Sequence, residues 1–115
     1  MAMIDRKKFN ENFVYLDKEV IVEIIDIFLN EYKERLKTLQ DNISAMDWAN
    51  LKFNAHSLKG VIANFMDPQT IELSRALDER AKLQDDNGLQ ELYTNLKTAT
   101  ESLVAELLDL KKELT

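Results

Sequence analysis

The chain has 115 residues and a mass of 13.4 kDa, with 15 basic and 21 acidic side chains and a net charge of −6. This acidic balance repels polyphosphates and anionic lipids, so we expect neither nucleic acid nor a membrane as a partner. Because there is no cysteine and only one histidine, we exclude a disulfide framework and thiolate chemistry, and we expect no metal site.

Two glycines and one proline in the whole chain predict few turns, which favours long helices over a β-sandwich or barrel. The length predicts one hydrophobic core, and therefore a single domain over residues 1–115. The stretch from Val20 to Leu29 is interrupted by Glu23 and Asp26, so we expect no membrane span. The N-terminus has no apolar signal core, and we expect a cytoplasmic protein.

Two helices are predicted in the first part of the chain. Asp5 can cap a short helix to about residue 12, with Phe9 and Phe13 as its apolar contacts. Asp17 can cap the next helix, from Lys18 to about Ser44. Its apolar residues recur at spacings of three and four, which places them on one face: Ile21, Ile25, Phe28, Tyr32, Leu36, Leu39 and Ile43.

Two further helices are predicted in the middle of the chain. Asp47 is a good cap for a third helix, whose core stripe is Trp48, Leu51, Ala55, Leu58, Ile62 and Phe65. Asp67 and Pro68 form a cap and first-turn pair for a fourth helix that fades near Gln84. The residues expected to point inward from it are Ile71, Leu73, Leu77 and Ala81.

The segment from Asp85 to Gly88 is the one strong turn signal, and a last long helix follows it. Its apolar stripe is Leu89, Leu92, Leu96, Ala99, Leu103, Leu107, Leu110 and Leu114. Together these elements predict an all-α fold, an antiparallel four-helix bundle with a short extra N-terminal helix.

Gly60 lies in the middle of the third predicted helix, where glycine costs about 1 kcal/mol relative to alanine. At about 100° of rotation per residue, it shares one strip of the helix surface with Lys52, His56, Lys59 and Ala63. His56 directly follows the core residue Ala55, so its ring is expected at the edge of the core with one face open to solvent. The strip therefore combines the single imidazole, two ammonium groups and two nearly bare stretches of backbone.

This combination suits an anion that is passed to the imidazole. Histidine has an unperturbed pKa of about 6.5, so the neutral ring offers a nucleophilic nitrogen towards phosphorus at pH 7. Lysines one turn away on either side, Lys52 and Lys59, would neutralise the oxygens of a phosphoryl group. Lys52 is equally explained as a solvated surface charge.

Residues 56–60, His-Ser-Leu-Lys-Gly, resemble the His-x-Leu-Lys-Gly signature of histidine-containing phosphotransfer (HPt) domains. The resemblance extends along the chain through Phe28, Leu36, Asp47, Trp48, Ala55, Asn64, Leu77 and Asp78. It implies that His56 accepts a phosphoryl group from a receiver-domain aspartate and passes it to another receiver. It also implies that Lys59 screens the phosphoryl charge and that Gly60 lets the receiver approach closely.

The resemblance further implies that Asp78 lies near the histidine and orients its ring, although it could also be an ordinary exposed carboxylate. Asn64 belongs to the same surroundings or is a plain helix-surface amide. Where the family usually has glycine and then a small residue, this chain has Met66 and Asp67, so the exit turn is expected to differ. Ala63, with Val61 or Met66, is expected to form a small apolar docking patch.

The function implied is that of a phosphocarrier in a multistep two-component phosphorelay, without kinase activity of its own. Its partners would be response-regulator receiver domains, which supply Mg²⁺, and a hybrid histidine kinase; we expect a monomer without a cofactor. The alternative is an adaptor that binds receivers or other helical proteins without transferring phosphate. A metal-binding bundle oxidase is set aside, because it needs paired Glu-x-x-His motifs, whereas Phe53 lies three residues before the only histidine.

Overall fold

The computed structural model describes residues 3–115, and these residues form five helices and no strand. The helices are α1 (Arg6–Asn12), α2 (Lys18–Ser44), α3 (Trp48–Ala63), α4 (Pro68–Leu83) and α5 (Leu89–Leu114). The fold is therefore all-helical, as the scarcity of turn residues predicts, and it is compatible with a helical bundle.

The helix boundaries follow local signals in the sequence. Asp5 and Asp47 are N-caps whose carboxylates accept hydrogen bonds from backbone N–H groups of the first turns of α1 and α3. Asp17 and Asp67 also stand at N-cap positions, but neither carboxylate makes that bond. For these two residues the predicted position is right and the predicted side-chain cap is wrong.

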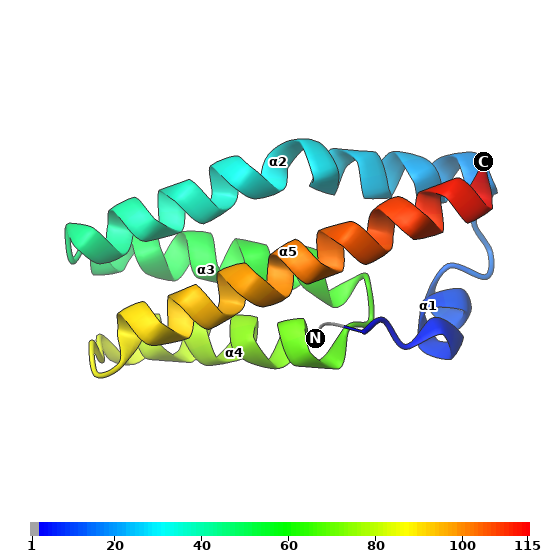
Figure 1. Cartoon of the computed structure of the whole chain (residues 1–115). Helices are drawn as coiled ribbons and strands as arrows, with labels where there is room; N and C mark the ends of the chain where they lie inside the picture. The colour runs from blue at the N-terminus through cyan, green and yellow to red at the C-terminus, as the bar shows by residue number, and fades with distance from the viewer. Residues whose placement is uncertain (1–2) are drawn as a thin grey trace.

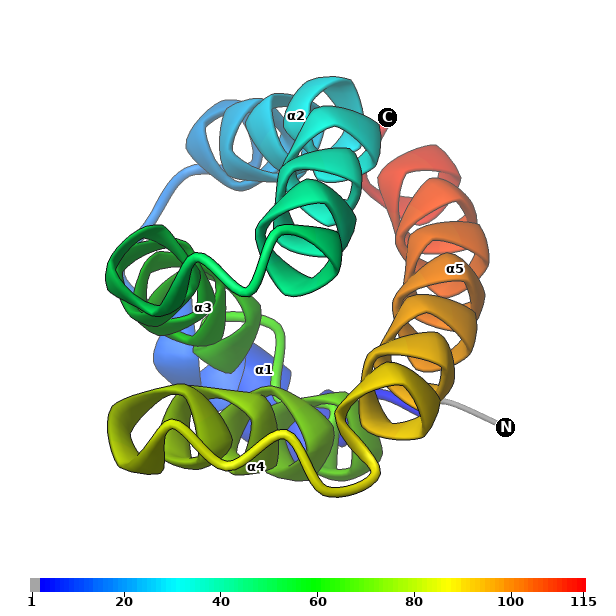
Figure 2. The same cartoon turned by 90° about the vertical axis from the view of Figure 1, so that its left-hand side faces the viewer.

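The four longer helices surround a common core. In Figures 1 and 2, α2 and α4 lie opposite each other, and each contacts both α3 and α5. The 27 residues of α2 correspond to a rise of about 40 Å, which accounts for the 42 Å long axis of the molecule. Because α3 and α4 have 16 residues each, α2 and α5 extend beyond them at one end.

The short helix α1 lies at this end of the molecule (Figure 1). The rings of Phe9 and Phe13 are buried there and pack edge to face with centroids 4.8 Å apart. The backbone N–H of Ile4 donates to the Glu106 carboxylate, at 2.9 Å to one oxygen, and that of Asp5 donates to the Met66 carbonyl at 2.7 Å. Ile4 and Asp5, which lead into α1, are therefore hydrogen-bonded to both α5 and the α3–α4 turn.

The core consists largely of the predicted stripes, with differences where neighbouring helices change the exposure. Six residues expected inside are only partly buried against the core: Tyr32, Trp48, Ile71, Leu73, Leu92 and Leu114. Buried residues that the apolar pattern does not indicate include one tyrosine and several polar side chains: Tyr93, Thr70, Ser74, Asp78 and Thr100. The interior of the bundle thus contains hydroxyl and carboxyl groups, at positions that do not belong to the predicted apolar stripes.

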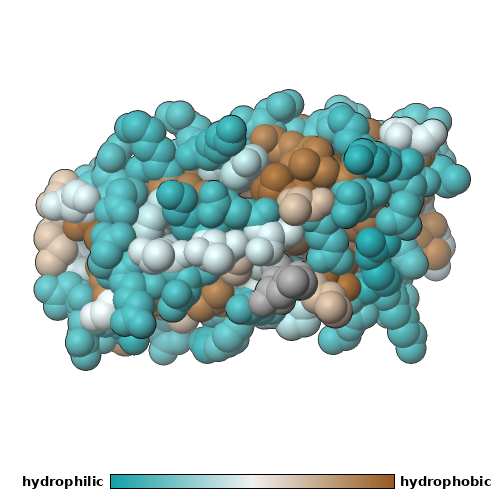
Figure 3. Space-filling model, in the orientation of Figure 1, coloured by the Kyte–Doolittle hydropathy of each residue, from teal (hydrophilic) through white to brown (hydrophobic). Residues whose placement is uncertain are grey.

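The surface is mostly polar, with apolar side chains in patches on the face shown in Figure 3. Across residues 3–115, no helix combines the length and apolarity needed to cross a membrane.

Candidate functional site

His56 lies near the middle of α3 with its side chain 64% exposed. Its neighbours Ala55 and Leu58 are each about 1% exposed and hold this turn of the helix against the core. The ring therefore stands at the edge of the core with an open face, as the helical spacing predicts.

The buried carboxylate of Asp78, on α4, is the centre of a cluster of charged side chains. Its side chain is 2% exposed, and a single oxygen, Oδ2, lies 3.4 Å from His56 Nδ1, 2.9 Å from Lys59 Nζ and 3.2 Å from Lys82 Nζ. The other oxygen, Oδ1, is buried and has no hydrogen-bond partner among residues 3–115. The exposed-carboxylate alternative for Asp78 is therefore wrong, and the residue lies beside the histidine.

The protonation of Asp78 is set by two opposing effects. Burial raises the pKa of the carboxyl, but the hydrogen bonds from Lys59, Lys82 and His56 outweigh it, so the pKa lies below its usual value. Asp78 is therefore a carboxylate at neutral pH. A carboxylate facing Nδ1 favours the tautomer with the proton on Nδ1, which leaves the lone pair of Nε2 free.

The two ammonium groups on Asp78 come from different helices. Lys59 is one turn beyond His56 on α3, and its side chain is 30% exposed. Lys82 is on α4, four residues after Asp78, and its side chain is 47% exposed. Lys82 is not among the residues predicted for the site, although the Asp-x-x-x-Lys spacing on one helix is a signal for this pair.

Gly60 is exposed, and a methyl group added at its Cα would meet nothing within 4 Å. Packing within the chain therefore does not require a glycine here, although the residue costs helix stability. Ala63, one turn further along α3, is also exposed. The backbone after His56 is thus open to a second molecule.

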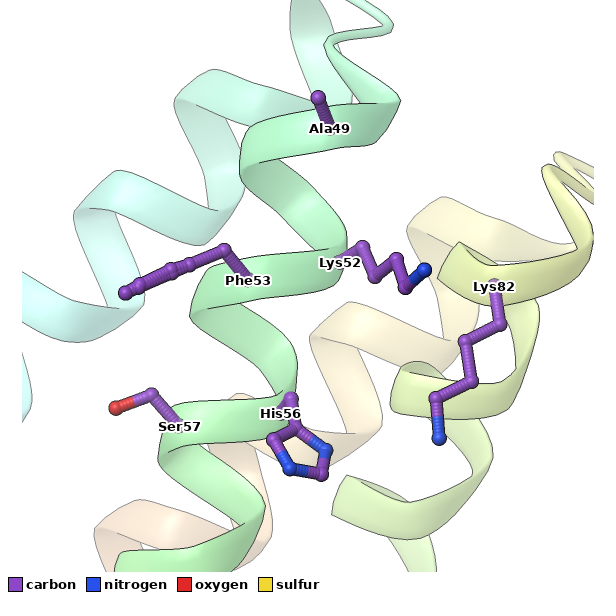
Figure 4. Close-up of a pocket in the computed structure, with 6 residues that line it drawn as sticks. All are labelled: Ala49, Lys52, Phe53, His56, Ser57 and Lys82. Atoms are coloured by element: carbon purple, nitrogen blue, oxygen red, sulfur yellow. The ribbon is translucent and has the colours of Figure 1, made fainter.

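A surface hollow of about 410 Å³ lies on the other side of His56, lined by Ala49, Lys52, Phe53, His56, Ser57 and Lys82. Figure 4 shows the ammonium groups of Lys52 and Lys82 on one side of the hollow and the ring of Phe53 on the opposite side. Phe53 is 62% exposed and is not among the residues predicted for the surface near the histidine. An exposed aromatic ring one turn before His56 is a candidate docking contact.

The predicted apolar patch after the histidine differs from the structure. Val61 and Met66 are half-buried and pack against the core, so they do not form an exposed patch with Ala63. Asn64 is exposed at the end of α3, where its carbonyl accepts a hydrogen bond from the Asn12 side chain at 3.2 Å. It does not line the hollow beside His56.

The exit turn after α3 has an unusual backbone conformation. Met66 has φ of +57°, in the left-handed region that glycine adopts without cost. The Asp67 side chain is fully buried and accepts a hydrogen bond from the Thr70 hydroxyl at 2.5 Å. Met66 therefore occupies a backbone conformation that suits glycine. The Asp67 carboxylate is bound to Thr70 inside the protein.

Within the part of the chain that the structure describes, no group of three or more His, Cys, Asp or Glu side chains could hold a metal ion. The family model of the Hpt domain matches residues 23–113. No curated protein and no solved structure matches the chain. The match covers α3 and α4 entirely, α5 up to residue 113 and most of α2, and so includes all the residues of the charged cluster.

Proposed function

Since the chain belongs to the Hpt domain family, whose members carry phosphoryl groups on histidine in phosphorelays, we propose that His56 is the phosphoacceptor. It takes the phosphoryl group from an aspartyl phosphate of one receiver domain and passes it to an aspartate of another. The chain acts as a carrier without kinase activity of its own. The observation that carries this proposal is the exposed imidazole whose Nδ1 faces a buried carboxylate 3.4 Å away.

The transfer uses Nε2, the ring nitrogen that does not face Asp78. The lone pair of His56 Nε2 forms a bond to phosphorus while the bond between phosphorus and the receiver carboxylate oxygen breaks, and the carboxylate leaves with that electron pair. The ring gains positive charge as the new bond forms, and the Asp78 carboxylate, accepting the Nδ1 proton in a hydrogen bond, stabilises that charge. Lys59 supplies positive charge towards the phosphoryl oxygens. The return transfer follows the same path in reverse.

Two features support a receiver domain as the partner. The bare backbone at Gly60 allows close approach, and the lysines beside His56 complement the acidic phosphorylation site and phosphoryl group that a receiver presents. The receiver brings the Mg²⁺, and a hybrid histidine kinase stands upstream. We propose that the receiver also contacts Lys52 and Ala63 on the surface of α3 around His56, and Asn64 at the edge of that surface.

We also propose that residues 1–115 form one domain that acts as a monomer. We take the helical bundle to be an antiparallel four-helix bundle with α1 added at one end. The contacts of α2 and α4 with both α3 and α5 support this arrangement, as does the reversal of the chain at each turn between long helices in Figure 1.

The test is phosphate transfer from a labelled phospho-receiver to the wild-type chain and to His56→Gln. Wild type should gain label that is labile to acid and stable to alkali, and the variant should gain none, because no other imidazole exists in the chain. Ser57→Ala is the matched control on the same turn of α3 and should retain the label. Label persisting on His56→Gln would refute the assignment. A receiver that binds wild type without ever labelling it would favour an adaptor instead.

A further inference from the structure

The charged cluster at His56 contains one more cation than the sequence signature provides. The ammonium groups of Lys59 and Lys82 both bind Asp78 Oδ2, at 2.9 and 3.2 Å. Because they share one oxygen, which is also 3.4 Å from His56 Nδ1, both ammonium groups are held beside the ring. In Figure 4 the Lys82 side chain runs alongside α4, and its ammonium group ends level with the His56 ring on the α4 side of the hollow.

The balance of charge explains why one lysine cannot compensate both Asp78 and a phosphoryl group. Asp78 is a buried carboxylate, and its negative charge offsets the positive charge of one lysine. A phosphoryl group adds a charge of about −1.5 to −2 near pH 7. With Lys59 and the positively charged ring as the only cations beside Asp78, part of the phosphoryl charge would therefore remain uncompensated. A second ammonium group supplies the surplus positive charge that the phosphorylated state needs.

We propose that Lys82 is a second phosphoryl-binding residue, held near His56 by Asp78 and shared with the phosphoryl oxygens once His56 is phosphorylated. This inference rests on the proposed function of His56 as phosphoacceptor. Lysine suits the task because its ammonium group is a compact charge with three donors on a flexible stem, so it can bind two anions at once. The side chain is 47% exposed, which leaves the ammonium group free to turn towards an anion in the hollow.

A purely structural explanation is that Lys82 only pairs with Asp78 within α4, as many lysines do four residues after an aspartate. The two explanations differ in what they predict for the phosphorylated protein. A structural pair affects the stability of the fold, whereas a phosphoryl-binding lysine also affects the energy of the phosphoryl group itself. The experiment therefore measures the pKa of the phosphoryl group on His56 and the equilibrium of its transfer.

The chain is first phosphorylated with phosphoramidate, a small donor that needs no receiver. The N–P bond of the donor breaks, a bond from His56 Nε2 to phosphorus forms, and ammonia leaves. Titration by ³¹P NMR then gives the pKa of the bound phosphoryl group. Losing a nearby cation disfavours the dianion, so Lys82→Gln and Lys82→Met should raise this pKa by roughly 0.5 to 1 pH unit. Lys82→Arg should restore the wild-type value, and Lys112→Gln, on the exposed end of α5, should not change it.

The second measurement is the equilibrium between phospho-receiver and phosphorylated chain. Lys82→Gln should shift it towards the receiver by roughly 5- to 10-fold, the range for a partly exposed charge contact. If both Lys82 variants melt at a lower temperature but keep the wild-type phosphoryl pKa and equilibrium, the lysine only neutralises Asp78 and the inference is overturned. Wild type that is phosphorylated by phosphoramidate but by no receiver would refute the proposed function, while the pKa measurement would still decide the role of Lys82.

Discussion

Replacing Gly60 with glutamine should stabilise the fold and impair transfer at the same time. A Cβ atom added at this position would meet nothing within 4 Å, and the backbone of α3 is helical there. Removing a glycine from an exposed helix interior gains roughly 0.5 to 1 kcal/mol. With an unfolding entropy of about 2.1 cal/mol/K per residue, this gain corresponds to a melting temperature roughly 2 to 4 °C higher.

The loss of phosphoryl transfer has its cause in the open space beside Gly60, which the glutamine side chain would fill. Gly60 lies about 40° around the helix from His56, so a glutamine side chain would stand beside the imidazole and keep a partner's backbone away from it. A displacement of about 1 Å at the reacting atoms costs roughly 100-fold in rate. We expect a loss of this order in both directions of transfer. Gly60→Ala should show the same gain in stability with a smaller loss of rate.

The assay is a thermal melt paired with single-turnover transfer from a phospho-receiver, both on one preparation. Ala105→Gln is the matched control, because it places the same side chain on an exposed position of α5; it should alter neither property appreciably. A Gly60→Gln variant that is less stable and still transfers at the wild-type rate would show that the glycine serves the bundle, and would refute the reasoning.

Two further predictions concern stability. Asp78→Asn should destabilise the fold at pH 7 by about 1 to 3 kcal/mol, because the carboxylate that binds Lys59 and Lys82 is lost. The lowered pKa of Asp78 means that its contribution is present above the unfolded-state pKa of about 4 and disappears as the pH falls through the lowered folded-state pKa. Urea unfolding of wild type and Asp78→Asn at pH 7 and at strongly acidic pH measures this contribution. An equal difference in unfolding free energy between the two proteins at both pH values would contradict the prediction. Gln84→Gly should raise the melting temperature by roughly 2 to 4 °C without affecting transfer, since Gln84 is exposed with φ of +51° at the end of α4; Gln84→Ala keeps the strain and should show no such gain.

The sequence alone determines the helices and the position of the imidazole. Helix ends depend on residues close together in the chain, so Asp5 and Asp47 mark the starts of α1 and α3 without any knowledge of packing. The regular spacing of apolar residues on α3 likewise places His56 next to a buried alanine and therefore at the rim of the core. The unusual glycine in mid-helix identifies the same surface, because its cost to the helix is local.

Other features depend on how neighbouring helices pack. The left-handed backbone at Met66 is not indicated by its residue type, because methionine rarely adopts it. The exposure of Phe53 and the partial burial of Val61 against the core depend on which sides of α3 are covered by α2 and α4. For this reason the sequence predicts an apolar patch after the histidine, whereas the exposed aromatic ring lies before it.

The charged cluster itself is decided only by tertiary structure. Asp78 is 22 residues from His56 in the chain, and by spacing alone it could be an exposed carboxylate. The packing of α4 against α3 buries Asp78 beside the imidazole and brings Lys59 to the oxygen that Lys82 binds within α4. Burial makes that carboxylate costly unless cations bind it, so the contact between the two helices turns separate surface charges into one site.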